Sequence, residues 1–261
     1  MSNDQQDYGI RAVIPDWRCR AVQSLDFSRT LIEDHDQTFF EATRILSSVY
    51  LTLHKQRGSA PYDPGDERSV DDQFWGLQRS STVIDCIVGS ACVSLMRWID
   101  QVKRIAIGEF TLLETEFPLA EDQEFDKETW ARHHHSVMHE YGSRLPGKTV
   151  TGALAVWQVG NVFKHSNDTH LRSRTKEVAR ALGFSSQLLE IPEHDSEGNL
   201  RQMALQEVDY TLGSESIERM GLILGCGPEQ GLMPLYRHVK SWQRAIDEKL
   251  LEEQIALRKL L

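Results

Sequence analysis

The stretch VDDQFWGLQRSSTVIDCIVGSACVSLMRWIDQVKRIAI, residues 70–107, decides the fold class, because its apolar residues recur at helical spacing around an unusually apolar centre. A helix that is apolar on nearly all sides is typical of a core helix with other helices packed about it. Its most apolar run, Thr82 to Met96, contains Asp85 and two serines, so we interpret it as too short and too polar to span a bilayer. The sequence therefore predicts a buried central helix and no membrane partner.

Further segments with helical spacing lie on both sides of this stretch. They are residues 30–56, 127–141, 152–164, 174–182, 203–224 and 232–261, separated by loops such as GSAPYDPGD at 58–66. The stretch 184–201, with Pro192 and Gly198, is expected to be a loop or a small hairpin, and it is the one place where we expect strands. We therefore predict an all-α fold, an irregular multi-helix bundle. Residues 1–25 are expected to form an irregular arm and residues 26–261 a single helical domain.

Composition and charge narrow the classes of partner. The chain has 261 residues, of which 40% are hydrophobic and 26% are charged, and this is typical of a folded protein. Its net charge of −10 disfavours broad non-specific binding of nucleic acid. The same charge favours either simple solubility or a basic protein partner.

The cysteines and the N-terminal residues predict the compartment. Cys19, Cys86, Cys92 and Cys226 form no CxxC pair, which favours a reducing compartment over a disulfide framework or a zinc knuckle. The opening residues MSNDQQDYGIRAVIP do not have the pattern of a secretion signal. We therefore expect a cytoplasmic protein, and a homodimer is among the oligomeric states that the sequence leaves open.

Residues 142–149, GSRLPGKT, satisfy the phosphate-binding loop pattern G-x-x-x-x-G-K-[ST]. In such loops backbone N–H groups surround the phosphates, a lysine reaches the β and γ oxygens, and a hydroxyl binds Mg²⁺. A buried strand should precede the loop, yet HHHSVMHEY precedes it, and Pro146 removes one of the N–H groups. The context favours a plain helix-to-helix turn over an NTP-binding loop.

Four histidines, His133, His134, His135 and His139, form a second candidate site. On a helix His135 and His139 lie one turn apart on the same face and could share a metal ion. Three consecutive histidines point in three directions, and the HExxH order is absent because Ser136 follows His135. The pattern favours a solvated polar face over a metal site at His135 and His139. No cofactor is predicted.

The stretch VWQVGNVFKHSNDTH, residues 156–170, contains the third candidate site. A helix that ends near Lys164 places Asn161 and His165 one turn apart on one face. This pattern resembles the end of the signature helix of the HEPN superfamily, helical proteins of which many act as RNases in defence and toxin–antitoxin systems. The resemblance covers about residues 70–170, and it implies a helical fold with Asn161 and His165 at the motif positions.

The sequence departs from that family's pattern at one position. Where the family has an arginine before the polar residue, this chain has Gly160. In the family the arginine and the histidine act together on the scissile phosphate of RNA, usually across a dimer, and glycine offers no bidentate group. Lys164 could supply charge without that geometry, and Arg172 and Arg174 are the nearest other cations. The resemblance therefore implies the fold more than the activity.

Motifs for nucleophilic catalysis are weaker. The chain has no GxSxG elbow, and Cys86, Cys92 and Cys226 have the apolar or glycine-rich neighbours that are typical of inert buried thiols. The sequence GCGPEQG, residues 225–231, is interpreted as a turn between two helices.

These observations leave four functions, in this order. The first is a non-catalytic helical interaction protein, of a bacterial defence or toxin-immunity type, that binds a basic protein partner. The second is a metal-independent ribonuclease that uses His165, assisted by Asn161 and Lys164, and acts on RNA. The third is a metal-binding or cofactor-binding helical enzyme built on the histidines at 133–139, and the fourth is an NTPase.

Overall fold

A single long helix, α3, forms the centre of the molecule. It spans Glu67–Thr115 and has 49 residues. At the usual rise per residue it is about 73 Å long. The computed structural model describes residues 17–34, 36–58, 67–115, 127–165, 173–183, 187–194, 200–208 and 216–260. The helix predicted over residues 70–107 is confirmed, and it continues beyond both predicted ends.

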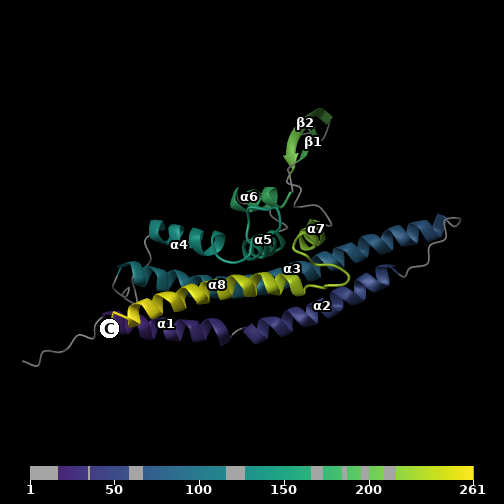
Figure 1. Ribbon diagram of the computed structural model, residues 1–261. Coiled ribbons are helices and arrows are strands. Elements are labelled where there is room, and N and C mark those ends of the chain that lie inside the picture. The colour runs from purple at the N-terminus through teal and green to yellow at the C-terminus, as the bar shows by residue number, and fades with distance from the viewer. Residues whose placement is uncertain are drawn as a thin grey trace, which may run out of the picture.

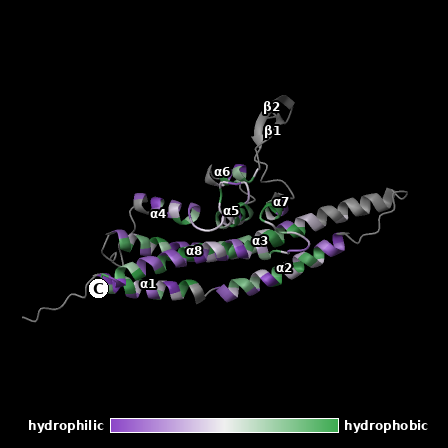
Figure 2. Ribbon diagram, in the orientation of Figure 1, coloured by the Kyte–Doolittle hydropathy of each residue, from purple (hydrophilic) through white to green (hydrophobic). Residues whose placement is uncertain are grey.

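Three long helices run beside α3. They are α1 (Trp17–Asp34), α2 (Asp36–Gly58) and α8 (Met233–Arg258), which together with α3 form an elongated bundle (Figure 1). Figure 2 shows hydrophobic and hydrophilic residues alternating along these helices, as amphipathic helices require. Trp98 of α3 stacks on Phe39 of α2 and on Tyr236 of α8, with ring centroids 5.4 and 5.7 Å apart. These rings join three of the four helices.

Residues 17–25 belong to α1, so the prediction of an irregular arm over residues 1–25 is wrong for this part. Ala21 and Leu25 are fully buried in the core. Ser28 continues the same buried stripe and donates a 2.6 Å hydrogen bond to the buried carboxylate of Glu109 in α3. A serine at a core position weakens the apolar pattern, which explains why the sequence does not reveal this helix. Residues 1–16 lie outside the described residues.

The helix predicted over residues 30–56 is divided in two. Residues 30–34 end α1, and α2 begins at Asp36 and continues to Gly58. Asp36 stands in the first turn of α2, where a carboxylate interacts favourably with the unpaired N–H groups. The chain therefore starts a new helix at an acidic residue. The apolar residues continue at helical spacing across this point, so the sequence does not reveal the break.

Four shorter helices lie on one side of α3 (Figure 1). They are α4 (Lys127–His139), α5 (Gly152–Lys164), α6 (Ser173–Leu182) and α7 (Ser216–Ile223). The helices predicted over 127–141, 152–164 and 174–182 are confirmed. Gly183, predicted as a helix stop, follows α6 with a φ of +97° that favours glycine.

A two-stranded antiparallel hairpin connects α6 to α7. Strand β1 is Gln187–His194 and β2 is Leu200–Val208, paired from Gln187 with Val208 to His194 with Leu200. The hairpin expected near 184–201 is confirmed and extends to residue 208. The helix predicted over 203–224 is therefore wrong for residues 203–208 and confirmed for α7, while residues 209–215 lie outside the described residues. The short run MALQEV, residues 203–208, fits the spacing of a helix as well as that of a strand, and it forms a strand because it pairs with β1.

Helix α3 also bears on the question of a membrane. From the shorter run Thr82–Met96 we expected a helix too short and too polar to span a bilayer. The helical segment Ser80–Glu114 is, by length and composition alone, long and apolar enough to do so. In the structure 56% of its most apolar window is buried, and α1, α2, α4, α5, α7 and α8 all pack against it. The core helix of a helical bundle can have the same length and composition as a membrane-spanning helix, and it is buried in this way.

The described part of the chain thus has the all-α, multi-helix fold that the sequence predicts, with one hairpin.

Candidate functional site

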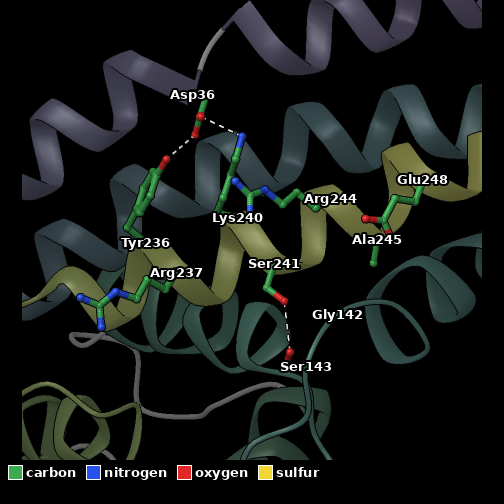
Figure 3. Close-up of a pocket in the computed structure, with 10 residues that line it drawn as sticks. All are labelled: Asp36, Gly142, Ser143, Tyr236, Arg237, Lys240, Ser241, Arg244, Ala245 and Glu248. Carbon is green, nitrogen blue, oxygen red and sulfur yellow. Dashed lines mark hydrogen bonds and ion pairs between the residues drawn. The ribbon is translucent and has the colours of Figure 1, made fainter. Parts of the chain in front are cut away.

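A groove of about 630 Å³ runs along α8, and residues on one face of α8 form its floor. One row of lining residues is spaced by four positions, and a second row lies beside it: Tyr236, Lys240, Arg244 and Glu248, then Arg237, Ser241 and Ala245. The walls are Asp36, at the start of α2, and Gly142–Ser143, in the turn between α4 and α5 (Figure 3). The groove therefore combines three segments that are far apart in the sequence.

Gly142 allows the turn to approach α8 closely. Its φ is +81°, and a Cβ atom on it would lie 2.8 Å from the Cα atom of Trp242. Trp242 is fully buried and donates from Nε1 to the carbonyl oxygen of Val137 in α4, at 2.7 Å. As a result Ser143 reaches α8, where its Oγ atom is 3.1 Å from that of Ser241. Two serine hydroxyls thus line the groove side by side.

Asp36 is bonded to two residues of α8. It accepts a 2.5 Å hydrogen bond from the hydroxyl of Tyr236, and its second oxygen lies 2.7 Å from Nζ of Lys240. Burial, and then the bond to Asp36, raise the pKa of Tyr236 above its usual range, which favours the protonated hydroxyl that donates to Asp36. One carboxylate therefore compensates the charge of Lys240 and holds both side chains in place.

Arg244 lies next to Lys240 and has no such compensation. Glu248 follows one turn later, at a spacing that permits an ion pair, yet no ion pair within 4 Å joins the two side chains. Figure 3 shows the side chain of Arg244 directed back along α8, on the side of Lys240. Among the residues described, neither Arg244 nor Arg237 forms an ion pair, and both are exposed. The groove therefore has an excess of positive charge.

The acidic residues of the chain are unevenly divided between the described and the remaining residues. Of the 39 acidic residues, 15 lie outside the described ranges, together with only 2 of the 29 basic residues. The described ranges consequently hold 24 acidic and 27 basic residues. The described part of the chain is therefore not acidic by count, and cations gather on one face of α8.

The three residues of the predicted ribonuclease site lie at the C-terminal end of α5, away from this groove. Lys164 is exposed, and Asn161 and His165 are half-buried. The backbone N–H of His165 donates to the carbonyl oxygen of Asn161 and closes the last turn. The helix thus places Asn161 and His165 one turn apart, as the sequence predicts. Arg172 and the side chain of Arg174, the predicted alternative cations, lie outside the described residues.

Gly160 is buried where α5 crosses α3. A Cβ atom on Gly160 would lie 3.0 Å from the carbonyl oxygen of Cys92, and a Cβ atom on Gly89 of α3 would meet the ring of Phe163 at 2.3 Å. The two glycines therefore let the helices approach more closely than larger residues permit. An arginine in place of Gly160 would bring its Cβ atom into this tight contact, so the backbone of α3 would have to give way to admit the residue that the HEPN motif needs.

The histidines of α4 point in different directions, as expected. The rings of His135 and His139 are parallel within 18° and 4.3 Å apart, on one face. They line a cavity of about 140 Å³ together with Glu177 and Trp157, while His134 is buried against the edge of Trp157. Within the described ranges, no three His, Cys, Asp or Glu side chains are arranged to hold a metal ion. The metal site at His135 and His139 therefore stays a prediction with two ligands.

The segment GSRLPGKT is a turn between α4 and α5, as predicted. Leu145 and Val150 share a backbone hydrogen bond across it, and Thr151 caps α5 by accepting from the N–H of Leu154. Lys148 points to the C-terminal end of α6, where Nζ is 3.4 Å from the carbonyl oxygen of Leu182. A helix precedes the turn, so the arrangement of a phosphate-binding loop is absent at these residues.

The buried thiols fit the prediction that they are inert. Cys92 and Cys226 are buried, and burial raises the pKa of Cys226 to about 12 and that of Cys92 well above its usual value. Thiols of this kind are poor nucleophiles at neutral pH. Cys86 is exposed, which differs from the expectation that it too is buried.

Comparison of the chain with family models, with curated proteins and with solved structures finds no match. The geometry of the site therefore carries the functional argument. No motif marks Lys240 or Arg244 in the sequence, although the four-residue spacing of the row on α8 is visible in the helix predicted over 232–261. What the sequence could not show is that Asp36 and Ser143 lie opposite that row.

Proposed function

We propose that this chain is a non-catalytic helical interaction protein that binds an anionic group in the α8 groove. The observation that carries the proposal is the pair of exposed arginines, Arg237 and Arg244, which stand on either side of Lys240 and form no ion pair within the described ranges. Guanidinium groups bind carboxylates and phosphates through two parallel hydrogen bonds. The hydroxyls of Ser143 and Ser241 supply neutral donors in the same groove.

The composition of the groove supports binding rather than catalysis. Its lining residues include neither a histidine nor a cysteine, and Ser143 and Ser241 bond to each other rather than to a base. Of the two carboxylates in the groove, Asp36 is occupied by Tyr236 and Lys240, and no hydrogen bond joins Glu248 to either serine within the described ranges. These side chains therefore do not include a nucleophile that is hydrogen-bonded to a base.

Calorimetric titration with sodium pyrophosphate at low ionic strength tests the proposal. We expect binding to the wild type, and binding at least about ten-fold weaker in Arg237→Ala/Arg244→Ala, because hydrogen bonds to charged groups are lost. The matched control is Arg20→Ala/Lys259→Ala, which removes two exposed cations outside the groove and should bind as the wild type does. Equal affinity in all three proteins would contradict the proposal.

A basic protein partner remains a second candidate, because of one feature of the sequence. Residues 116–126, EFPLAEDQEFD, contain five carboxylates and no cation. Such a segment attracts a cationic partner through electrostatic steering. Replacing its carboxylates by amides should weaken binding of polylysine if the segment acts in this way, whereas Arg237→Ala/Arg244→Ala should not. The bacterial defence or toxin-immunity setting stays a prediction.

A further inference from the structure

The position of Arg244 indicates where an anion binds in the groove. Lys240 and Arg244 are like charges one turn apart, an arrangement that destabilises a helix by itself. Arg244 lies toward Lys240 although Glu248 is within reach of an ion pair on its other side. Asp36 supplies one negative charge to this pair of cations, and it also accepts from Tyr236. A bound anion between the two cations would supply the second charge.

The carboxylates of the groove limit the size of that anion. Asp36 lies beside the Tyr236 end of the row, and Glu248 ends the row on the other side. Successive members of the row are about 6 Å apart along the helix. A polyanion that ran along α8 would bring neighbouring phosphates against Glu248 or Asp36, and like charges repel. The groove therefore suits one compact anionic group.

We propose, on the basis of the proposed function, that the groove binds a phosphomonoester of a small hydroxyl-rich molecule, with its phosphate between Lys240 and Arg244. A phosphate group can bond to both cations at once, and its oxygens can also accept hydrogen bonds from the serine hydroxyls. Hydroxyl groups on the rest of the molecule would donate to Glu248, the carboxylate with no ion pair to Arg244. The volume of about 630 Å³ is typical of sites for small molecules.

Titrations of four probes into the full chain test this assignment. The probes are ribose 5-phosphate, ribose, inorganic phosphate and a 12-nucleotide single-stranded RNA. We expect ribose 5-phosphate to bind about ten-fold more tightly than inorganic phosphate, because it adds hydrogen bonds to a carboxylate. Ribose should not bind measurably. The RNA should bind no more tightly than ribose 5-phosphate.

Two variants of exposed residues locate the contacts. Arg244→Gln should weaken binding of both phosphate and ribose 5-phosphate about ten-fold or more, because it removes the uncompensated cation next to Lys240. Glu248→Gln should reduce the preference for ribose 5-phosphate over phosphate without weakening phosphate itself. Thermal unfolding followed by circular dichroism should be unchanged in both variants, since each side chain is exposed.

Failures of the two proposals are distinguishable. Tighter binding of the RNA, with affinity that falls steeply as salt rises, would overturn the phosphomonoester assignment and leave an anion-binding groove. Equal affinity for phosphate and ribose 5-phosphate, or an unchanged preference in Glu248→Gln, would overturn it as well. No binding of any probe, and no binding of pyrophosphate, would overturn both proposals.

Discussion

The backbone N–H of Glu218 donates a 2.6 Å hydrogen bond to Oδ1 of Asp85, a residue 133 positions earlier in the chain. Glu218 stands in the first turn of α7, where N–H groups have no partner within the helix. Its carboxylate lies 2.9 Å from Arg57 of α2. An aspartate of the central helix thus caps α7, and one residue of α7 connects it to two long helices.

Asp85→Ala should lower the free energy of unfolding by about 1–2 kcal/mol, the usual cost of losing a helix cap. The loss arises because the N–H of Glu218 remains buried against α3 without an acceptor. Urea denaturation followed by circular dichroism measures it. Asp85→Asn keeps an acceptor oxygen, so its free energy of unfolding should fall clearly less than that of Asp85→Ala. Equal losses of stability in the two variants would show that the hydrogen bond to Glu218 does not stabilise the fold.

The stability of the protein should fall as the pH drops below 6.5. Burial lowers the pKa of His238 from its usual 6.5, against a smaller opposite effect of its bond to the Leu224 carbonyl oxygen. Burial, and then the nearby Arg57, likewise lower the pKa of His54. As the pH falls, His238 and His54 are therefore protonated in the unfolded chain before they are protonated in the folded protein. The stability that their neutral forms contribute is fully present above pH 6.5 and is lost as the pH falls toward their folded-state pKa values.

Guanidinium unfolding at pH 7.5 and pH 5.5 measures this dependence. His238→Gln keeps a donor for the Leu224 carbonyl oxygen and removes the titration. We expect the difference between the two pH values to be smaller in this variant than in the wild type. A difference as large as that of the wild type would mean that other groups cause the acid sensitivity.

The strongly periodic helices were predictable, and the exceptions have local physical reasons. Helix α3 follows from its apolar residues, and α5 was predicted with its observed bounds. The first part of helix α1, residues 17–29, is not evident from the sequence because Ser28 occupies a core position that a distant carboxylate, Glu109, makes favourable. Strand β2 was missed because its sequence fits two periods and a neighbouring strand decides between them.

The groove was harder to predict than the helices. Its floor is a row on one helix, which spacing reveals, but its walls come from residues 36 and 142–143. Gly142 belongs to a phosphate-loop pattern in the sequence, whereas in the structure it lets the turn pack against Trp242. Motif patterns record which residues are present. Contacts between distant segments depend on packing that no single segment encodes.

Gly160→Arg should destabilise the fold by about 3 kcal/mol or more, because it combines overpacking with an unpaired buried charge. The first side-chain atom would already be 3.0 Å from the carbonyl oxygen of Cys92. Chemical denaturation measures the change. Lys164→Arg, an exposed site in the same helix, is the control and should change stability by no more than about 0.5 kcal/mol. Wild-type stability in Gly160→Arg would mean that α5 can move away from α3.

The same contact leads to a prediction about ribonuclease activity. With EDTA present, neither the wild type nor His165→Ala should cleave single-stranded RNA, because the position before Asn161 cannot hold a guanidinium against a phosphate. Gel analysis of labelled RNA, with pancreatic ribonuclease as the positive control, measures cleavage. Cleavage by the wild type that disappears in His165→Ala would establish the ribonuclease alternative. It would also require another cation near the end of α5 to take the arginine's place, since Lys164 is a point charge without the bidentate geometry.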